Sequence, residues 1–562
     1  MNISRRAAAL VSLILLTGCT SPAEQAPPPP APEPARAPTE AATLTDLVRA
    51  WVDARAELDP DWATRTGVHE HDARLTRYDD RSWQSRRQLA RAALVAVERW
   101  PTADLSVAER GDAELFGTLL RVEVHEDERH DARRDSPGMA LLPVAAVNDL
   151  LIRDFAPREE RAWLAVSRLQ QLPGVLAELR PLLDRPPALW TGMAIKEIDG
   201  ALAFLDDVPA LAGPTPGLDE ALAAARAALA DHRTFLEQEV LPRSDGSYAI
   251  GRAEFDWRLR NVYLLDLDAE RLLAMGRQQF DLTLRLLDET AQQIDPARDW
   301  RALLAEMMEQ HPTQEALLDT YRDEVAHARQ FLIDHDIVGI PDETLAIRET
   351  PAFMRTTTPF AAYDMPAPLD ESRLGNFFVT PDPEAHILSD IPGTTWHEAY
   401  PGHHLQFVYA KDNPSLVRRL NESPLLSEGW GFYCEELAHE TGYYDDPRER
   451  LMQLNWRLQR EARVMLDCSI HAFGMSYEDA VAFLTDQVGL SRGTAEASVN
   501  AYTRQPTYFS SYMLGMLEIV RMREACRERL GPGFSLREFH ERLLRCGNVP
   551  PALVEQALAE WR

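Results

Sequence analysis

The stretch Thr394–Gln406, TTWHEAYPGHHLQ, constrains the fold most, because Pro401 and Gly402 interrupt a segment that carries three histidines. Proline removes a backbone donor and clashes with the preceding helical turn, and glycine adopts dihedral angles that other residues avoid. In an unbroken helix His404 would share the azimuth of His397 but lie about 10.5 Å further along the axis, too far for one metal ion. The sequence therefore predicts a helix that ends or bulges near Pro401 and then restarts.

The histidines and the neighbouring glutamate are the residue types that hydrolytic zinc sites use. Zinc binds neutral imidazole nitrogens and carboxylate oxygens, and such a site needs three protein ligands, a water and a free carboxylate that takes the water's proton. We predict one zinc ion, with His397 as a ligand and Glu398 as the base. Relative to the HExxH spacing, a two-residue bulge makes His403 the second ligand and a three-residue bulge makes it His404. Both alternatives stay open, and we favour His403.

Glu428 is the predicted third ligand. It lies in Ser427–Leu437, SEGWGFYCEEL, whose two glycines permit close backbone approach and which resembles the glutamate helix of thermolysin-like zinc enzymes. About two turns on, Glu435 or Glu436 can hydrogen-bond a ligating imidazole, as metal-bound histidines usually require. The competing interpretation is a pair of capping or core histidines beside an exposed glutamate.

Several segments together resemble the bacterial family known as domain of unknown function 885. They are DPDWATRTGVHEHDARL, HEAYPGHHLQ, SEGWGFYCEEL, PTYFSSYMLG and FSLREFHERLLRCGNVP. The resemblance extends over nearly the whole mature chain, and the PGHH string is specific to the family. It implies a divergent zinc metallopeptidase with a thermolysin-type, gluzincin-like catalytic core, and hence hydrolysis of peptide bonds.

Hydrolysis also requires a donor for the oxyanion of the tetrahedral intermediate. Tyr512 falls at the tyrosine of the family's SY-x-x-G pattern, so the resemblance makes it the first candidate. Arg504 is the second, because a guanidinium donates hydrogen bonds without competing for the metal.

Apolar residues at helical spacing predict a mostly α protein with a small β element next to the metal helix. The predicted helices are Thr45–Leu58, Trp83–Trp100, Ala108–Glu128, Glu159–Leu183, Leu218–Val240 and Ala269–Ile294. The best strand is Leu374–Thr380. We expect it to be an edge strand that binds the substrate backbone, with Asn376 and Phe378 lining the cleft.

The N-terminus predicts export. Arg5 and Arg6 precede the apolar run Ala7–Leu16, which fits a signal peptide, and the following Leu16–Cys19 resembles a lipobox in which Cys19 is lipidated. The predicted organisation is a signal peptide (1–19), a Pro/Ala-rich disordered tether (20–43), an N-terminal helical lobe (44–250) and a catalytic helical lobe (251–562). The predicted location is the cell envelope, with membrane contact only through the N-terminal lipid.

Composition narrows the function further. A formal net charge of −30 argues against nucleic-acid binding. The four cysteines that remain after processing lack disulfide or metal-site spacing, which predicts buried free thiols. The chain is therefore expected to be a zinc-dependent peptidase acting on a peptide or a peptide-like amide. The alternative is an inactive envelope lipoprotein that binds peptides or has a structural role. The sequence indicates no oligomeric state.

Overall fold

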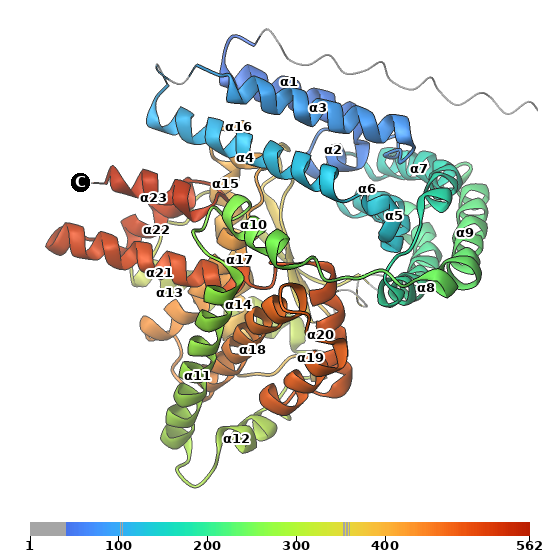
Figure 1. Ribbon diagram of the computed structural model, residues 1–562. Coiled ribbons are helices and arrows are strands. Elements are labelled where there is room, and N and C mark those ends of the chain that lie inside the picture. Colours follow the sequence, from blue (N-terminus) through green and yellow to red (C-terminus); the bar gives the residue numbers. More distant parts are fainter. Residues whose placement is uncertain are drawn as a thin grey trace, which may run out of the picture.

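The computed structural model describes residues 41–561 except 102, 104, 352–354, 356–357 and 359. The predicted signal peptide, its lipidation site Cys19 and the tether up to residue 40 lie outside the described residues. The described part is mostly helical with one small sheet, as the sequence predicts (Figure 1). In this part, none of the helices combines the length and the apolar character needed to cross a membrane.

The helices group around three hydrophobic cores. The first is formed by α1 (Leu44–Leu58), α3 (Asp80–Glu98), α4 (Val107–Arg129), α10 (Arg252–Asn261), α13 (Leu317–Asp334), α14 (Ile391–Glu398), α15 (His403–Lys411), α16 (Leu416–Leu420), α17 (Pro424–Glu440), α21 (Ser511–Leu530), α22 (Leu536–Arg545) and α23 (Pro551–Ala559). The second is formed by α6 (Leu142–Ile152), α7 (Arg158–Leu179), α8 (Ala188–Ala212) and α9 (Leu218–Phe235). The third is formed by α11 (Ala269–Ile294), α12 (Trp300–Met307), α18 (Pro447–His471), α19 (Tyr477–Phe483) and α20 (Arg492–Arg504). The short helices α2 (Pro60–Thr66) and α5 (Ala132–Asp135) complete the set.

The first core joins the beginning and the end of the chain. In Figure 1 the blue helices α1, α3 and α4 lie above the red helices α21–α23, while α7–α9 form a separate group at the right. The division into lobes 44–250 and 251–562 stays a prediction. The cores group the helices differently, because α1, α3 and α4 pack with the helices that carry the predicted metal ligands.

The six predicted helices are confirmed as α1, α3, α4, α7, α9 and α11, with α7 and α9 each extended by a short irregular turn. Several of these helices begin with a side-chain cap. Thr43 and Asp46 form a capping box on α1, Ser106 and Glu109 form another on α4, and Asp268 caps α11. The four cysteines between residues 434 and 546 are buried free thiols, as predicted.

The sheet contains β1 (Thr344–Glu349), β2 (Ala361–Asp364) and β3 (Leu374–Val379), in the order β1-β3-β2. The predicted strand Leu374–Thr380 is confirmed as β3, but its predicted edge position is wrong. β3 lies in the centre, parallel to β1 and antiparallel to β2, and Phe378 is buried there rather than lining a cleft. Asn376 donates to Asp364 of β2. Of the two edge strands, β2 is the one that contacts the end of α14, through the Tyr363 N–H and Glu398.

Helices α17 and α21 pack unusually closely through two glycines. A Cβ atom at Gly429 or at Gly515 would overlap the backbone of the other helix, and at Gly515 it would strike the carbonyl oxygen of Leu425. Backbone cannot move aside as a flexible side chain can, so alanine at either position forces the helices apart.

We therefore expect Gly515→Ala to reduce the free energy of unfolding by about 3 kcal/mol, the upper part of the range for overpacked cores. The matched control is Gly493→Ala in α20, where an added Cβ meets no neighbouring atom and helix propensity favours alanine. The measurement is the urea unfolding midpoint. Equal midpoints for the two variants would contradict the close packing of α17 and α21.

Candidate metal centre

The predicted break in the histidine segment is confirmed. Helix α14 ends at Glu398 and α15 begins at His403, with Pro401 and Gly402 between them. A Cβ atom at Gly402 would overlap the carbonyl oxygen of His397, so only glycine lets the chain fold back against the end of α14. This fold-back brings the rings of His397 and His403 to a centroid distance of 4.7 Å.

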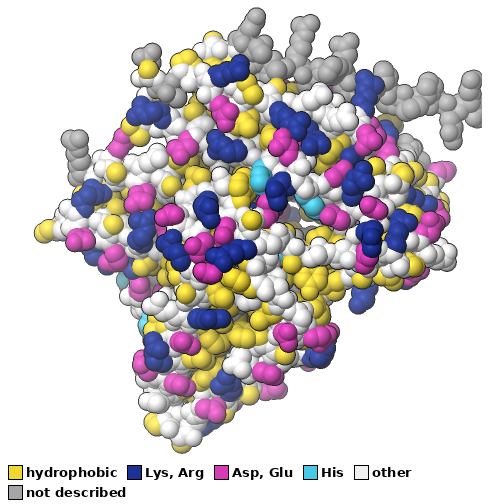
Figure 2. Space-filling model, viewed as in Figure 1, with side chains coloured by type: hydrophobic (Ala, Val, Ile, Leu, Met, Phe, Trp, Pro, Cys, Tyr) yellow, Lys and Arg dark blue, Asp and Glu magenta, His cyan; other side chains and the backbone are white. Residues whose placement is uncertain are grey.

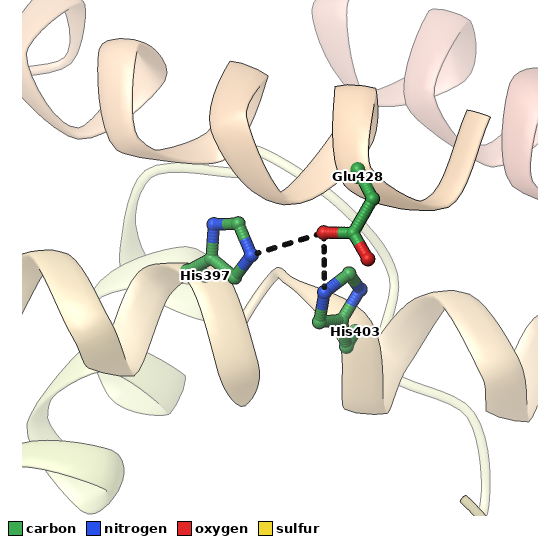
Figure 3. A group of neighbouring side chains, drawn as sticks. All are labelled: His397, His403 and Glu428. Carbon is green, nitrogen blue, oxygen red and sulfur yellow. Dashed lines mark ion pairs between the residues drawn. The ribbon is translucent and has the colours of Figure 1, made fainter. Parts of the chain in front are cut away.

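Glu428 meets these two histidines from a different helix. Figure 3 shows both imidazoles pointing toward the carboxylate of Glu428, whose side chain extends from α17. The Nε2 atoms of His397 and His403 lie 3.8 and 3.7 Å from the same oxygen, Glu428 Oε2. The potential ligand atoms of all three residues lie within 4.8 Å of one another. The structure thus brings together three residues predicted as metal ligands.

Glu435 fixes the orientation of His397. Its Oε1 atom accepts a hydrogen bond at 2.8 Å from Nδ1, which leaves Nε2 facing Glu428, and Arg460 pairs with Glu435 at 2.7 Å. Glu428 and Glu435 are seven residues apart and so share one face of α17. A Cβ atom at Gly431, between them, would lie 2.6 Å from Cε1 of His397, so this glycine leaves room for the imidazole. Of the two predicted partners Glu435 makes the contact, whereas Glu436 pairs with arginines of α18.

The three side chains are electrostatically coupled. Burial alone would lower the pKa of His397, but the nearby carboxylates of Glu428 and Glu435 outweigh it and raise the pKa to about 9. Burial would likewise raise the pKa of Glu428, yet His397 and His403 hold it well below its usual range. The carboxylate therefore attracts positive charge at this point, which either protons on the imidazoles or a metal cation can supply.

His404 does not join this group. Its side chain is fully buried, with Nε2 3.0 Å from Glu343 and Nδ1 3.1 Å from the hydroxyl of Tyr363. Both ring nitrogens are thus engaged on the side of α15 that faces the sheet. Adjacent helical residues point about 100° apart, so His403 and His404 cannot both face Glu428. Of the two alternatives for the second ligand, the structure places His403 and not His404 with His397.

Glu398, the predicted base, lies at the edge of the sheet. Its Oε2 atom accepts a hydrogen bond at 3.1 Å from the backbone N–H of Tyr363 in β2. The side chain is partly exposed, whereas His397 and His403 are buried. This arrangement joins the end of α14 to the edge strand and leaves the second carboxylate oxygen, Oε1, free of that bond.

The two candidate oxyanion donors lie in different surroundings. The ring of Tyr512 lies 6.4 Å from that of His397 and carries the guanidinium of Arg463 5.3 Å above it. Arg504 instead pairs with Glu197 of α8, and it lines a separate cavity.

The hydroxyl of Tyr508 donates to Glu428 Oε1 at 2.7 Å. Burial and Glu428 raise the pKa of Tyr508, so its hydroxyl stays protonated as a donor.

Comparison with known proteins identifies the family. A family model described as "Bacterial protein of unknown function (DUF885)" matches residues 60–558. The chain belongs to DUF885. The resemblance read from the sequence motifs is therefore confirmed at the level of the family. No curated protein matches the DUF885 chain.

Two solved structures share the fold of this DUF885 protein. One, named "a putative lipoprotein of unknown function" from Shewanella oneidensis, is 24% identical, covers 92% of this chain and 100% of its own, and has a TM-score of 0.78. The other, named "the putative lipoprotein" from Colwellia psychrerythraea, is 19% identical, covers 91% of this chain and 97% of its own, and has a TM-score of 0.80. At these identities the likeness shows the fold alone.

The donor set of the DUF885 site fits a divalent cation. Two imidazoles and one carboxylate are a ligand set of hydrolytic zinc sites. Ligand atoms on tetrahedral zinc lie about 3.4 Å apart, so the two separations from Glu428 need to close by only a few tenths of an ångström. The hydrogen bond that His397 Nδ1 donates to Glu435 is the support that a ligating imidazole requires.

Sequence reasoning missed two arginines of α18 that surround this site. Arg460 holds Glu435, and both Arg460 and Arg463 lie over the ring of Tyr512. No local motif marks them, because α18 is distant in sequence from the histidine segment. Their side of α18 also carries apolar residues of ordinary helical spacing, so the pattern indicates only a packed helix.

Proposed function

We propose that this DUF885 protein is a zinc-dependent hydrolase that cleaves peptide bonds in the cell envelope. The observation that carries the proposal is the convergence of His397, His403 and Glu428 on one point, with Glu398 beside them at an edge strand. Two features support a thermolysin-type, gluzincin-like arrangement of the catalytic core. They are the break between α14 and α15 and the glutamate on α17.

The proposed chemistry assigns the proton transfers to Glu398. Bound by His397, His403 and Glu428, a zinc ion would polarise the substrate carbonyl and make a water more acidic. Glu398 takes a proton from the water that attacks the carbonyl carbon, and then gives it to the leaving nitrogen as the C–N bond breaks. The N–H of Tyr363 holds Oε2 of Glu398 during both transfers, so Oε1 is the oxygen that carries the proton.

The edge strand β2 is the proposed binding surface for the substrate backbone. In an antiparallel strand, the N–H and C=O of one residue point to the same side. The N–H of Tyr363 points to Glu398, away from β3, so its carbonyl also points away from β3, toward the side where an extended peptide would bind. This would place the scissile bond next to the base.

We propose Tyr512 as the donor to the oxyanion. Tyr508 is already committed to Glu428 and Arg504 to Glu197. Arg463 lies over the ring of Tyr512 and favours negative charge near it. The developing oxyanion therefore meets a phenol donor in a positively charged environment.

We also propose that lipid on Cys19 anchors the protein in the envelope. The lipobox-like sequence at residues 16–19 supports this, and so do the names of the two similar structures. The catalytic body would then act outside the bilayer, tethered by the Pro/Ala-rich segment.

The test is metal content and hydrolysis by the purified protein. We expect about one zinc ion per chain, as for one His₂Glu site. We also expect cleavage of a peptide library, read by mass spectrometry, that stops with a chelator and returns with added zinc. A protein that binds no metal and cleaves no peptide would instead favour the inactive peptide-binding lipoprotein.

A further inference from the structure

We propose that a cavity between α6, α8 and the end of α20 is a subsite for the carboxyl end of a short peptide, and that it takes a bulky apolar side chain next to a free carboxylate. This inference rests on the proposed peptidase function and names its substrate class. The face in Figure 2 is hollowed between the N-terminal helices above and α18 and α20 below, with apolar side chains beside the hollow.

The cavity has the size and the walls of an apolar binding site. Its volume is about 750 Å³, within the range of small-ligand pockets. The apolar lining includes Met139, Leu141, Val144, Ala145, Trp190 and Ala201. This surface favours a large aliphatic or aromatic side chain, because its burial removes apolar area from water.

The charged residues at the cavity indicate that the ligand also carries a carboxylate. Arg504 and Glu197 neutralise each other through a two-pronged ion pair. Lys196 also lines the cavity, and among the described residues no carboxylate lies within ion-pair distance of it. The chain has a net charge of −30, so an unpaired cation beside an apolar wall stands out as a site for an anionic group. A terminal carboxylate fits it.

Asn148 supplies a further polar contact. Its side-chain oxygen Oδ1 is buried and has no hydrogen-bond partner in the described part of the chain. A buried acceptor without a donor costs free energy, which a ligand N–H recovers. A backbone N–H of a bound peptide is such a donor. The cavity therefore offers an apolar wall, a cation and an acceptor together.

Two walls connect the cavity with the candidate metal centre. On one wall, α6 carries Asn148, and five residues later Arg153 lies 3.7 Å from Asp364 of the edge strand β2. Five helical residues span about 7.5 Å. On the other wall, Arg504 lies four residues before Tyr508, and Tyr508 donates a hydrogen bond to Glu428. Four residues span at most about 14 Å.

These short connections place the walls of the cavity close along the chain to β2 and to Glu428. An extended peptide advances about 3.3 Å per residue, so a few residues of substrate would link the two sites. A peptide on β2 whose carboxylate reaches Lys196 would thus be cleaved a few residues before its C-terminus. The enzyme would release short peptides from carboxyl ends.

The test is binding of N-acetyl-alanyl-phenylalanine and of its amide, by calorimetry, to the full chain carrying Glu398→Gln. Gly200 lines the cavity, and an added Cβ there meets no atom within 4 Å, so Gly200→Trp fills the space and Gly200→Ala is the matched control. We expect the acid to bind about tenfold more tightly than the amide, the size of one charged contact. Gly200→Trp should weaken binding of the acid at least tenfold, and Gly200→Ala should leave it unchanged. Lys196→Gln should abolish the difference between acid and amide.

The outcomes separate this inference from the proposed function. Two results would overturn the subsite. One is that Gly200→Trp and Gly200→Ala bind the acid equally well, and the other is that the unsubstituted cavity binds the acid and the amide equally well. If the acid binds as expected but the unsubstituted enzyme cleaves no peptide, the cavity assignment holds and the hydrolase proposal fails. If peptides are cleaved with the same kcat/KM by Gly200→Trp and Gly200→Ala, the hydrolase holds and the subsite fails.

Discussion

Glu398→Gln is expected to reduce the rate of peptide hydrolysis about 10³-fold and to leave the zinc content unchanged, because general-base catalysis typically contributes 10²- to 10⁴-fold. A glutamine carbonyl still accepts the hydrogen bond from Tyr363 N–H, so the end of α14 and the edge strand keep their arrangement. The amide cannot take a proton from water at neutral pH. The measurements are kcat with a cleaved library peptide and zinc by elemental analysis.

The matched control for this prediction is Glu384→Gln. Glu384 is exposed, lies in the turn Pro383–Ala385 and has no place in the proposed mechanism. It should retain the full rate and the full zinc content. A full rate in Glu398→Gln would remove Glu398 from the mechanism. A low rate accompanied by loss of zinc would show that Glu398 supports the metal site rather than the proton transfer.

Local chemistry explains what the sequence could predict. Pro401 and Gly402 act within one turn of the helix, so their effect on the histidine segment is readable without tertiary structure. The face shared by Glu428 and Glu435 follows from helical spacing alone. Long amphipathic helices such as α11 are likewise marked by their own residues, with Asp268 as the capping residue.

Long-range contacts explain what the sequence could not predict. His404 is engaged by Glu343, 61 residues earlier, and by Tyr363 of β2. The central position of β3 depends on β1 and β2, two short strands in a proline-rich region with little alternation of their own. The Arg504–Glu197 pair joins residues 307 positions apart, so nothing local indicated that Arg504 would be turned away from the metal centre.

Although the spacing of the histidines departs from HExxH, the fold still brings His397 and His403 together. Two extra residues would carry the second histidine off the shared face of a continuous helix. Here Gly402 lets the backbone contact the end of α14, and Gly431 lets α17 approach the His397 ring. The two glycines thus allow the backbone to come close enough for His397, His403 and Glu428 to converge. In HExxH the regular spacing brings the two histidines together within one helix.

His403→Ala is expected to weaken zinc binding more than about 100-fold, a larger effect than the 10- to 100-fold loss typical of outer partners of a metal site. His404→Gln is its matched counterpart at the next position. Glutamine can still hydrogen-bond Glu343 and the Tyr363 hydroxyl, so this variant should keep its zinc and its thermal unfolding midpoint. The measurements are zinc affinity by competition with a chromophoric chelator and thermal unfolding of the metal-free proteins. The opposite pattern, with zinc lost in His404→Gln and kept in His403→Ala, would transfer the ligand role to His404. It would also require α15 to turn by about 100° from its position in this structure.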